Sequence, residues 1–183
     1  MLCPADDRHV LSQIVDTNLA MGADSDAKTR TLEALRILRQ AGLTRTSTFA
    51  IAEGILADVL MVQGNYQEAK NAVEHAISIG AETLRPLAPR FGSLITTLAQ
   101  ISQESEDLGR ALRLSRQAAD IFKRGGDPTT LELGSAYQNL AVVYALRGEK
   151  REAMNALDAA LSTWKPILAP NAPVRRSSSE QSI

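Results

Sequence analysis

An internal repeat of constant length constrains this chain more than any other feature of its sequence. Four alanines, Ala27, Ala69, Ala111 and Ala153, stand 42 residues apart. Further columns share this interval and hold Ala34, Ala76, Ala118 and Ala160; Ile14, Leu56, Leu98 and Leu140; Val15, Ala57, Ala99 and Ala141; Gly22, Gly64, Glu106 and Gly148; and Thr44, Pro86, Pro128 and Pro170. Because several residue types recur at one offset, four gapless units are expected, beginning near residues 8, 50, 92 and 134.

The last unit shows what each repeat is expected to form. Tyr137, Leu140, Ala141 and Tyr144 fall at i, i+3, i+4 and i+7, the spacing of one apolar stripe on a helix. Gly148 then predicts a tight turn. A second helical stripe follows, consisting of Ala153, Leu157, Ala160, Leu161 and Trp164. We therefore expect helical hairpins with the repeated alanines at close helix crossings and the prolines in the connections between units.

These residues resemble the tetratricopeptide repeat, whose pattern is W-x2-L-G-x2-Y, then A-x3-F, then A and P. The last unit reads Tyr137-x2-Leu140-Ala141-x2-Tyr144, then Ala153-x3-Leu157, Ala160 and a later proline. The second unit reads Leu56-Ala57-x2-Leu60, Gly64-Asn65-Tyr66, Ala69-x3-Val73 and Ala76. The first and third units depart from the pattern, with Asn18 and Ser102 at the second aromatic position and Thr31 and Ser115 at the A-x3-F position.

The interval of 42 residues also differs from the period of about 34 that is usual for this family. A longer unit opened by a proline resembles the kinesin-light-chain type of repeat, although GGDPTT stands where that type often has a histidine before the proline. The resemblance covers roughly residues 8 to 170. It implies an all-α fold, a right-handed α-solenoid of about four helix–turn–helix repeats arranged as an α–α superhelix.

The predicted domain organisation follows from the columns. Residues 1–7 are expected to be a leader, and residues 8–169 a solenoid with repeats 8–49, 50–91, 92–133 and 134–169. From Pro166 onward the chain is rich in proline and serine and lacks a period. Such a composition buries too little apolar surface to offset the entropy of ordering, so residues 170–183 are expected to form a disordered tail.

Composition excludes several functional classes. The formal net charge is −1, which gives no general attraction for nucleic acid or for an anionic membrane. Cys3 is the only cysteine, so no disulfide can form within the chain. The first residues lack the apolar stretch of a signal peptide, and no run of about 18 apolar residues occurs. We therefore expect a cytoplasmic protein.

The sequence carries little catalytic chemistry. With only His9, His75 and Cys3, no zinc cluster of Cys/His spacing can be built, and no glycine-rich phosphate loop precedes a helix. His75 is expected to be a solvated histidine on a helix surface. We predict that the chain is not an enzyme and needs no cofactor or metal.

A curved solenoid offers its inner face as a binding groove, because the first helix of each unit lines the concave side. By resemblance to the family, the concave positions are Ser12, Asp16, Gly54, Asp58, Met61, Thr96, Gln100, Gln103, Gln138, Asn139 and Val142. They are mostly small, neutral and hydrogen-bonding, and they include no Lys or Arg. The clamp by which some family members hold acidic peptide C-termini is therefore not expected, and an extended segment with a basic side chain fits better.

These features favour a scaffold or adaptor that binds a protein or peptide in this groove. Two alternatives stay open: a regulatory or sensory module of a signalling or transcriptional system, and a catalytic solenoid, which would need clustered titratable groups. The ends of the array raise a further expectation. Terminal units without polar caps expose their apolar interfaces, so the chain is expected to form a homodimer or a longer array through its ends.

Overall fold

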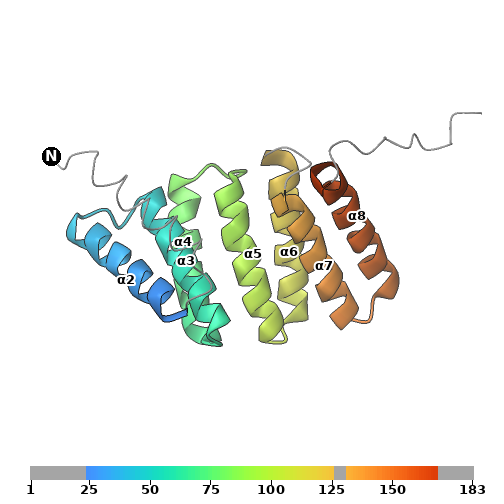
Figure 1. The fold of residues 1–183 in the computed structure, drawn as a ribbon, viewed down its shortest axis with the longest axis horizontal. Helices are drawn as coiled ribbons and strands as arrows, with labels where there is room; N and C mark the ends of the chain where they lie inside the picture. The colour runs from blue at the N-terminus through green and yellow to red at the C-terminus, as the bar shows by residue number, and fades with distance from the viewer. Residues whose placement is uncertain (1–23, 126–130, 169–183) are drawn as a thin grey trace, which may run out of the picture.

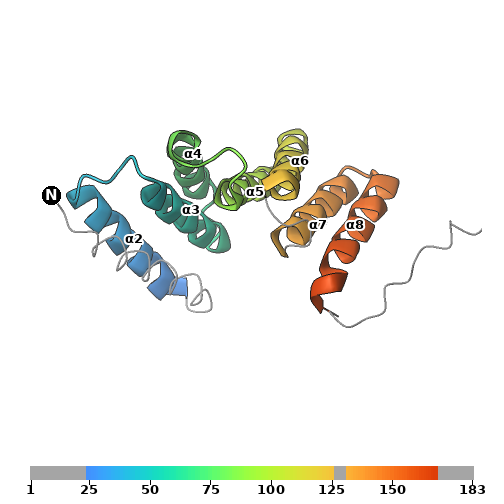
Figure 2. The same ribbon diagram turned by 90° about the horizontal axis from the view of Figure 1, so that it is seen from above.

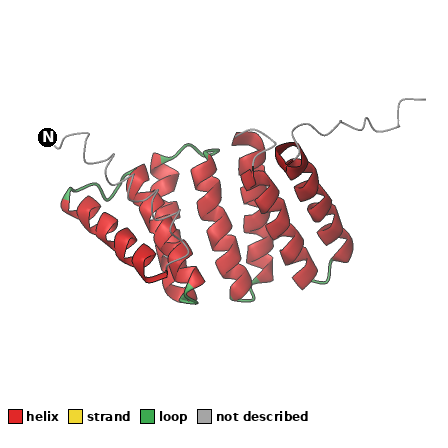
Figure 3. Cartoon of the chain, viewed as in Figure 1, coloured by secondary structure: helices red, strands yellow, loops and turns green. Residues whose placement is uncertain are grey.

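The computed structural model describes residues 24–125 and 131–168, and these residues form helices and short turns (Figure 3). The helices are α2 (Asp24–Gln40), α3 (Ser47–Val62), α4 (Tyr66–Thr83), α5 (Pro89–Glu104), α6 (Leu108–Gly125), α7 (Leu131–Leu146) and α8 (Lys150–Leu168). No strand occurs within these ranges. The predicted all-α helical repeat fold is confirmed.

The helices repeat at the interval that the sequence predicts. The first helices of three units, α3, α5 and α7, begin at Ser47, Pro89 and Leu131, 42 residues apart, and each contains 16 residues. The second helices α2, α4, α6 and α8 begin at residues 24, 66, 108 and 150, again 42 apart. The eight alanines of the two alanine columns are all buried. Small side chains at these positions allow the helices to pack closely.

The three described turns inside the hairpins share one geometry. Gly64 and Gly148 have φ of 75° and 78°, and in both turns the next residue donates its N–H to a carbonyl five residues earlier, from Asn65 to Leu60 and from Glu149 to Tyr144. This is the Schellman ending, which needs a left-handed residue. Glu106 holds the same place between α5 and α6 with φ 59°, and is the only described non-glycine residue with a positive φ. The turn geometry therefore persists where the glycine is absent.

The helices stand in one row, which is bent into an arch (Figures 1 and 2). α4 and α6 lie on the outer side of the arch, whereas α3, α5 and α7 lie on the inner side. Among the described helices, α3 packs on α5 and α5 on α7, whereas the second helices α4 and α6 meet through side chains, as in the 2.7 Å hydrogen bond from Arg110 to Glu74. Each second helix also packs on the first helix of the next unit. Because the first helices approach one another more closely than the second helices do, the row curves toward the first helices.

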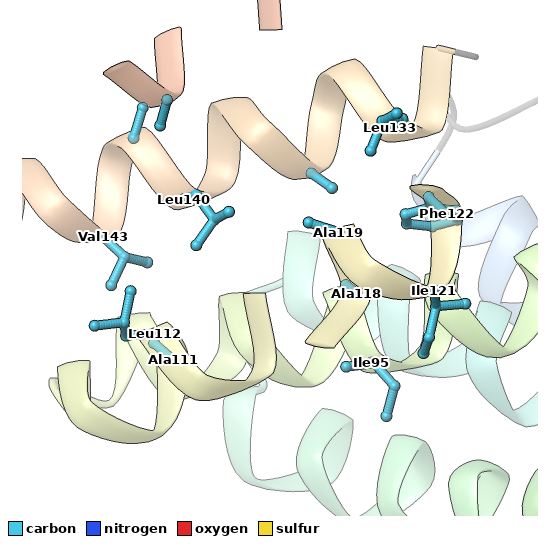
Figure 4. Close-up of a cluster of buried hydrophobic side chains, with 13 residues drawn as sticks. Ile95, Ala111, Leu112, Ala118, Ala119, Ile121, Phe122, Leu133, Leu140 and Val143 are labelled. Carbon is cyan, nitrogen blue, oxygen red and sulfur yellow. The ribbon is translucent and has the colours of Figure 1, made fainter. Parts of the chain in front are cut away.

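Large aromatic side chains fit onto glycines of the first helices. In α6, Phe122 lies where a Cβ on Gly92 of α5 would approach within 2.9 Å of its ring. One interval later, a Cβ on Gly134 of α7 would lie 2.0 Å from Nε1 of Trp164 in α8. Phe122 belongs to the apolar cluster that joins α5, α6 and α7 (Figure 4). The missing side chains at these glycines thus make room for the rings.

A buried glutamate links α2, α3 and α4. Glu53 of α3 is 5% exposed, and its Oε1 accepts a hydrogen bond of 3.1 Å from Arg39 of α2. His75 of α4 has Nδ1 3.6 Å from the same oxygen, and its ring packs edge-on against Phe49. His75 is exposed, as expected, but it also takes part in this packing. Sequence reasoning did not identify Glu53 as a buried charge.

Several expectations fall on residues that the structure does not describe: the leader 1–7, the first helix of unit one, Pro128, Pro170 and the tail 170–183. Helix α8 continues through Pro166 to Leu168, so helical structure extends into the proline-rich segment. In the described ranges, no helix has the length and apolar character required to cross a membrane. The same ranges contain no group of three or more His, Cys, Asp or Glu residues placed to hold a metal ion.

Candidate partner-binding groove

Three adjoining hollows run along the inner face of the arch, and together we call them the inner groove. The N-terminal hollow, about 180 Å³, lies between the first halves of α3 and α5. The central hollow, about 430 Å³, spans α3, α5 and the beginning of α7. The C-terminal hollow, about 270 Å³, lies at the last turns of α3 and α5 and the second half of α7.

The hollows share walls, so the inner groove is continuous. The N-terminal and central hollows share Asp58, Ser93 and Thr97. The central and C-terminal hollows share Met61, Val62 and Gln100. The shared residues come from α3 and α5, which pack directly on each other. The close approach of these two helices is what makes one groove out of three hollows.

The structure brings most of the predicted concave residues together. Those that line the central or C-terminal hollow are Asp58, Met61, Thr96, Gln100, Gln103, Asn139 and Val142. Gly54 lines the N-terminal hollow but is buried, and a Cβ there would lie 2.4 Å from Cδ2 of Leu94. Gln138 is exposed on α7 and lines none of the three hollows. Ser12 and Asp16 lie outside the described residues.

Asp58 is a titratable group of the groove whose pKa is shifted. Burial raises the pKa of its carboxyl, and a hydrogen bond of 2.7 Å from Oγ1 of Thr97 partly opposes that rise. Thr97 stands on α5 and Asp58 on α3, so the bond ties two units together at the wall that two hollows share. Asp58 therefore has a structural partner in addition to its place in the groove.

Sequence reasoning predicted Met61 and Val142 in the groove but missed other large, exposed apolar side chains there, Val62, Tyr66 and Leu131. Val62 and Val142 line the C-terminal hollow, Leu131 lines the central hollow, and all three are exposed. Tyr66, also exposed, reaches the C-terminal hollow from the first turn of α4. Its position could not be predicted from first-helix positions alone, because it belongs to a second helix. The groove is thus more apolar than the sequence analysis expected.

The expectation that the groove contains no Lys or Arg is wrong, because Arg90 of α5 lines the N-terminal hollow. Two carboxylates that were not predicted also line the groove, Glu132 in the central hollow and Glu104 in the C-terminal hollow. These positions lie in the first or last turn of a helix, where the curvature of the array decides which residues face inward. With Asp58, the acidic side chains still outnumber the basic one in these hollows.

Tyr66 and Glu104 lie together at the C-terminal hollow. The Glu104 carboxylate, with smaller contributions from burial and from their hydrogen bond, raises the pKa of the Tyr66 phenol. The phenol therefore keeps its proton at neutral pH and can donate a hydrogen bond to the carboxylate. Glu104 is the last residue of α5 and Tyr66 is the first of α4, so the pair forms across a boundary between units.

Solved structures with similar folds are known. BtubC from P. vanneervenii is 21% identical with a TM-score of 0.70, and the match covers 88% of this chain but only 64% of BtubC. Kinesin-light-chain TPR-like repeats from Podosopora anserina are 20% identical with a TM-score of 0.74, and 95% of this chain and 81% of that one are covered. At these identities the likeness concerns the fold.

A third structure, the Rap protein complexed with Competence and Sporulation Factor, is 16% identical with a TM-score of 0.69. The match covers 78% of this chain and 38% of the Rap chain. No sequence relative was found among curated proteins.

The tetratricopeptide repeat family matches residues 91–165, which span the third and fourth units. The same 42-residue spacing of helices extends to α2, α3 and α4, outside that match. Residues 91–165 therefore match the tetratricopeptide repeat family, and the fold of the array is similar to that of the TPR-like repeats from Podosopora anserina.

Proposed function

We propose that this chain is a non-catalytic scaffold or adaptor that binds an extended segment of a partner protein along the inner groove. One observation carries the proposal: exposed large apolar side chains gather in the groove, where Val62, Tyr66, Leu131 and Val142 line the central and C-terminal hollows. Clustered apolar side chains with a polar rim are typical of surfaces that another protein covers.

The polar residues of the groove suit a peptide backbone. Gln100, Gln103 and Asn139 line the C-terminal hollow, and each side-chain amide can both donate and accept a hydrogen bond. An extended peptide offers alternating N–H and C=O groups that need such partners when they leave water. The three hollows lie in succession, so consecutive side chains of one bound segment could occupy them.

The proposal is tested by selecting binders from a random peptide library displayed on phage and measuring their affinity by fluorescence anisotropy. Ser135 is exposed on α7 and lines the central hollow, so Ser135→Arg places a long side chain in the groove without disturbing the core. We expect this variant to weaken the selected peptides at least tenfold.

Ser162→Arg is the matched control, because Ser162 is exposed on α8, the second helix of the last unit. It should bind the same peptides with unchanged affinity. Peptides that bind equally well to wild type and to Ser135→Arg would refute the groove as the binding surface. Circular dichroism of each variant establishes that the fold is retained.

A regulatory or sensory role is the second candidate. It is supported by the likeness of the fold to the Rap protein, which was solved with Competence and Sporulation Factor bound. This role predicts that ligand binding changes the curvature of the array, which small-angle scattering with and without a selected peptide would reveal. A cytoplasmic location, favoured by the single cysteine, is proposed with either role.

A further inference from the structure

The C-terminal hollow combines an aromatic ring, a carboxylate and an apolar wall. Tyr66 and Glu104 lie next to each other, and Val62 and Val142 provide exposed apolar surface in the same hollow. Its volume of about 270 Å³ is slightly below the range of about 300–1,000 Å³ that small-molecule pockets occupy. A hollow of this size suits one side chain of a larger ligand.

The Tyr66–Glu104 pair is not required by the repeat. One and two intervals further along the chain, Leu108 and Lys150 take the place of Tyr66. Val62 and Leu146 take the place of Glu104 in the neighbouring units. Since the helices form with other residues at these positions, the packing of the array does not explain the pair. It is a property of this one boundary between units.

Among the residues that the structure describes, no ion pair neutralises the charge of Glu104. Asp58 and Glu132 add negative charge farther along the groove, while Arg90 lies in the N-terminal hollow at the opposite end. The field at the C-terminal hollow is therefore attractive for a cation.

We propose that the C-terminal hollow is a specificity pocket for a basic side chain, preferably arginine, of the partner segment. The guanidinium would bind the Glu104 carboxylate and stack on the Tyr66 ring, since Arg combines planar hydrogen bonding with stacking on aromatic faces. Its aliphatic stem would lie along Val62 and Val142, as the stems of long cationic side chains do on apolar surface. This inference rests on the proposed function, because it assigns the chemistry of the segment in the groove.

The test uses peptides that the wild-type protein selects from the phage library and that bind more weakly to the Ser135→Arg variant. These groove-bound peptides should share an arginine or lysine at one fixed position. Replacing that residue by citrulline, a neutral isostere of arginine, should lower the affinity about ten- to hundredfold, the range expected for a hydrogen bond to a charged group. The loss should shrink as the salt concentration rises.

Glu104→Gln removes the charge and keeps the shape of the side chain. It should weaken the basic peptide by a similar factor, and in this variant the citrulline exchange should have almost no further effect. Tyr66→Leu, which introduces the residue found one interval later, should weaken binding to a smaller extent. Glu68→Gln is the matched control, since Glu68 is exposed on α4 and does not line the hollow.

Groove-bound peptides without a shared basic residue, or with affinity unchanged by Glu104→Gln, would overturn the specificity pocket and leave the proposed function standing. If the selected peptides bind Ser135→Arg as tightly as wild type, both the specificity pocket and the proposed function are overturned.

Discussion

Glu106 adopts a backbone conformation that side chains disfavour. Its φ of 59° lies in the left-handed region, where Gly64 and Gly148 occupy the equivalent turns. A left-handed conformation costs a residue with a Cβ roughly 1–2 kcal/mol. The turn forms nevertheless, because the hydrogen bonds from Glu106 to Gln103 and from Asp107 to Ser102 close it in the same way.

Replacing this residue by glycine should stabilise the protein. We expect Glu106→Gly to raise the free energy of unfolding by about 0.5–1 kcal/mol, because the relief of strain outweighs the greater freedom of glycine in the unfolded chain. Urea titration followed by circular dichroism measures this change. Glu106→Ala removes the charge but keeps a Cβ at positive φ, so it should not raise the free energy of unfolding comparably. An equal rise in both variants would show that the loss of charge, and not the relief of strain, is the cause.

Asp58 makes stability depend on pH. Burial raises the pKa of its carboxyl in the folded protein. The folded protein therefore holds this proton more tightly than the unfolded chain does, and the resulting stabilisation is present below the ordinary pKa of about 3.9 and is lost as pH rises through the raised value. At neutral pH the buried charge opposes folding.

Asp58→Asn should thus be more stable than wild type at pH 7, since the amide oxygen can still accept the hydrogen bond from Thr97. The difference in the free energy of unfolding should narrow as the pH is lowered toward 3, which urea titrations at both pH values would detect.

Thr97→Val should change stability in the opposite direction. The free energy of unfolding should fall by about 1–3 kcal/mol at pH 7, because the Asp58 carboxylate loses its hydrogen-bond donor.

Among the helices, the contact between the second and first helix of a unit depends on a large and a small residue. Trp164 of α8 lies over Gly134 of α7, where it also donates a hydrogen bond of 3.3 Å to the carbonyl of Leu131. Phe122 and Gly92 form the same contact one interval earlier. In the second unit both equivalent residues are small, Gly80 and Ala50, so the contact with a large ring is confined to the third and fourth units.

Gly134→Ala should destabilise the last hairpin. Alanine favours the helix by about 1 kcal/mol, but overpacking against the indole costs typically 1–3 kcal/mol, so a net loss of up to about 2 kcal/mol is expected in a thermal or urea melt. Gly109→Ala is the control, because a Cβ there would meet other atoms only at 3.8 Å. It should be neutral or slightly stabilising, and an equal loss in both variants would contradict the role of Trp164.

The helices could be predicted from the sequence, but the lining of the groove could be predicted only in part. Columns such as Ala69 and Gly64 fix which residues form helices and turns, because those contacts lie within one unit. Tyr66 and Glu104 meet across two units, and Arg90 enters the groove from the first turn of α5. Such contacts depend on the tilt between units, which the period of 42 residues does not specify.

The whole molecule exposes one of its own packing surfaces. Met154, Leu157 and Leu161 of α8 are exposed, whereas Leu112, Ser115 and Ala119, the equivalent residues of α6, are buried where α7 packs on α6. In the described structure, α8 thus presents the face that another hairpin covers elsewhere in the array. Exposed interfaces of this kind promote association between solenoids.

Self-association through α8 is therefore expected to increase with concentration. Sedimentation velocity should give a mass above the 19.7 kDa of one chain at high concentration. The double variant Leu157→Asp, Leu161→Asp should restore a monomer. Leu32→Asp is the control, because Leu32 is also exposed but its equivalents Glu74, Arg116 and Asp158 are charged. A wild-type mass that stays monomeric at every concentration would exclude association by this face.

The difference between the inner and outer sides of the arch has a mechanical consequence: α3 packs directly on α5, whereas α4 and α6 meet through side chains such as Arg110 and Glu74. The closely packed first helices can therefore serve as the hinge side of the array, and a change in curvature mainly alters the side-chain contacts on the outer side. A segment bound across α3, α5 and α7 would span the inner side of the arch and fix its curvature. Occupancy of the groove would thereby be transmitted to the far ends of the row as a change in their separation.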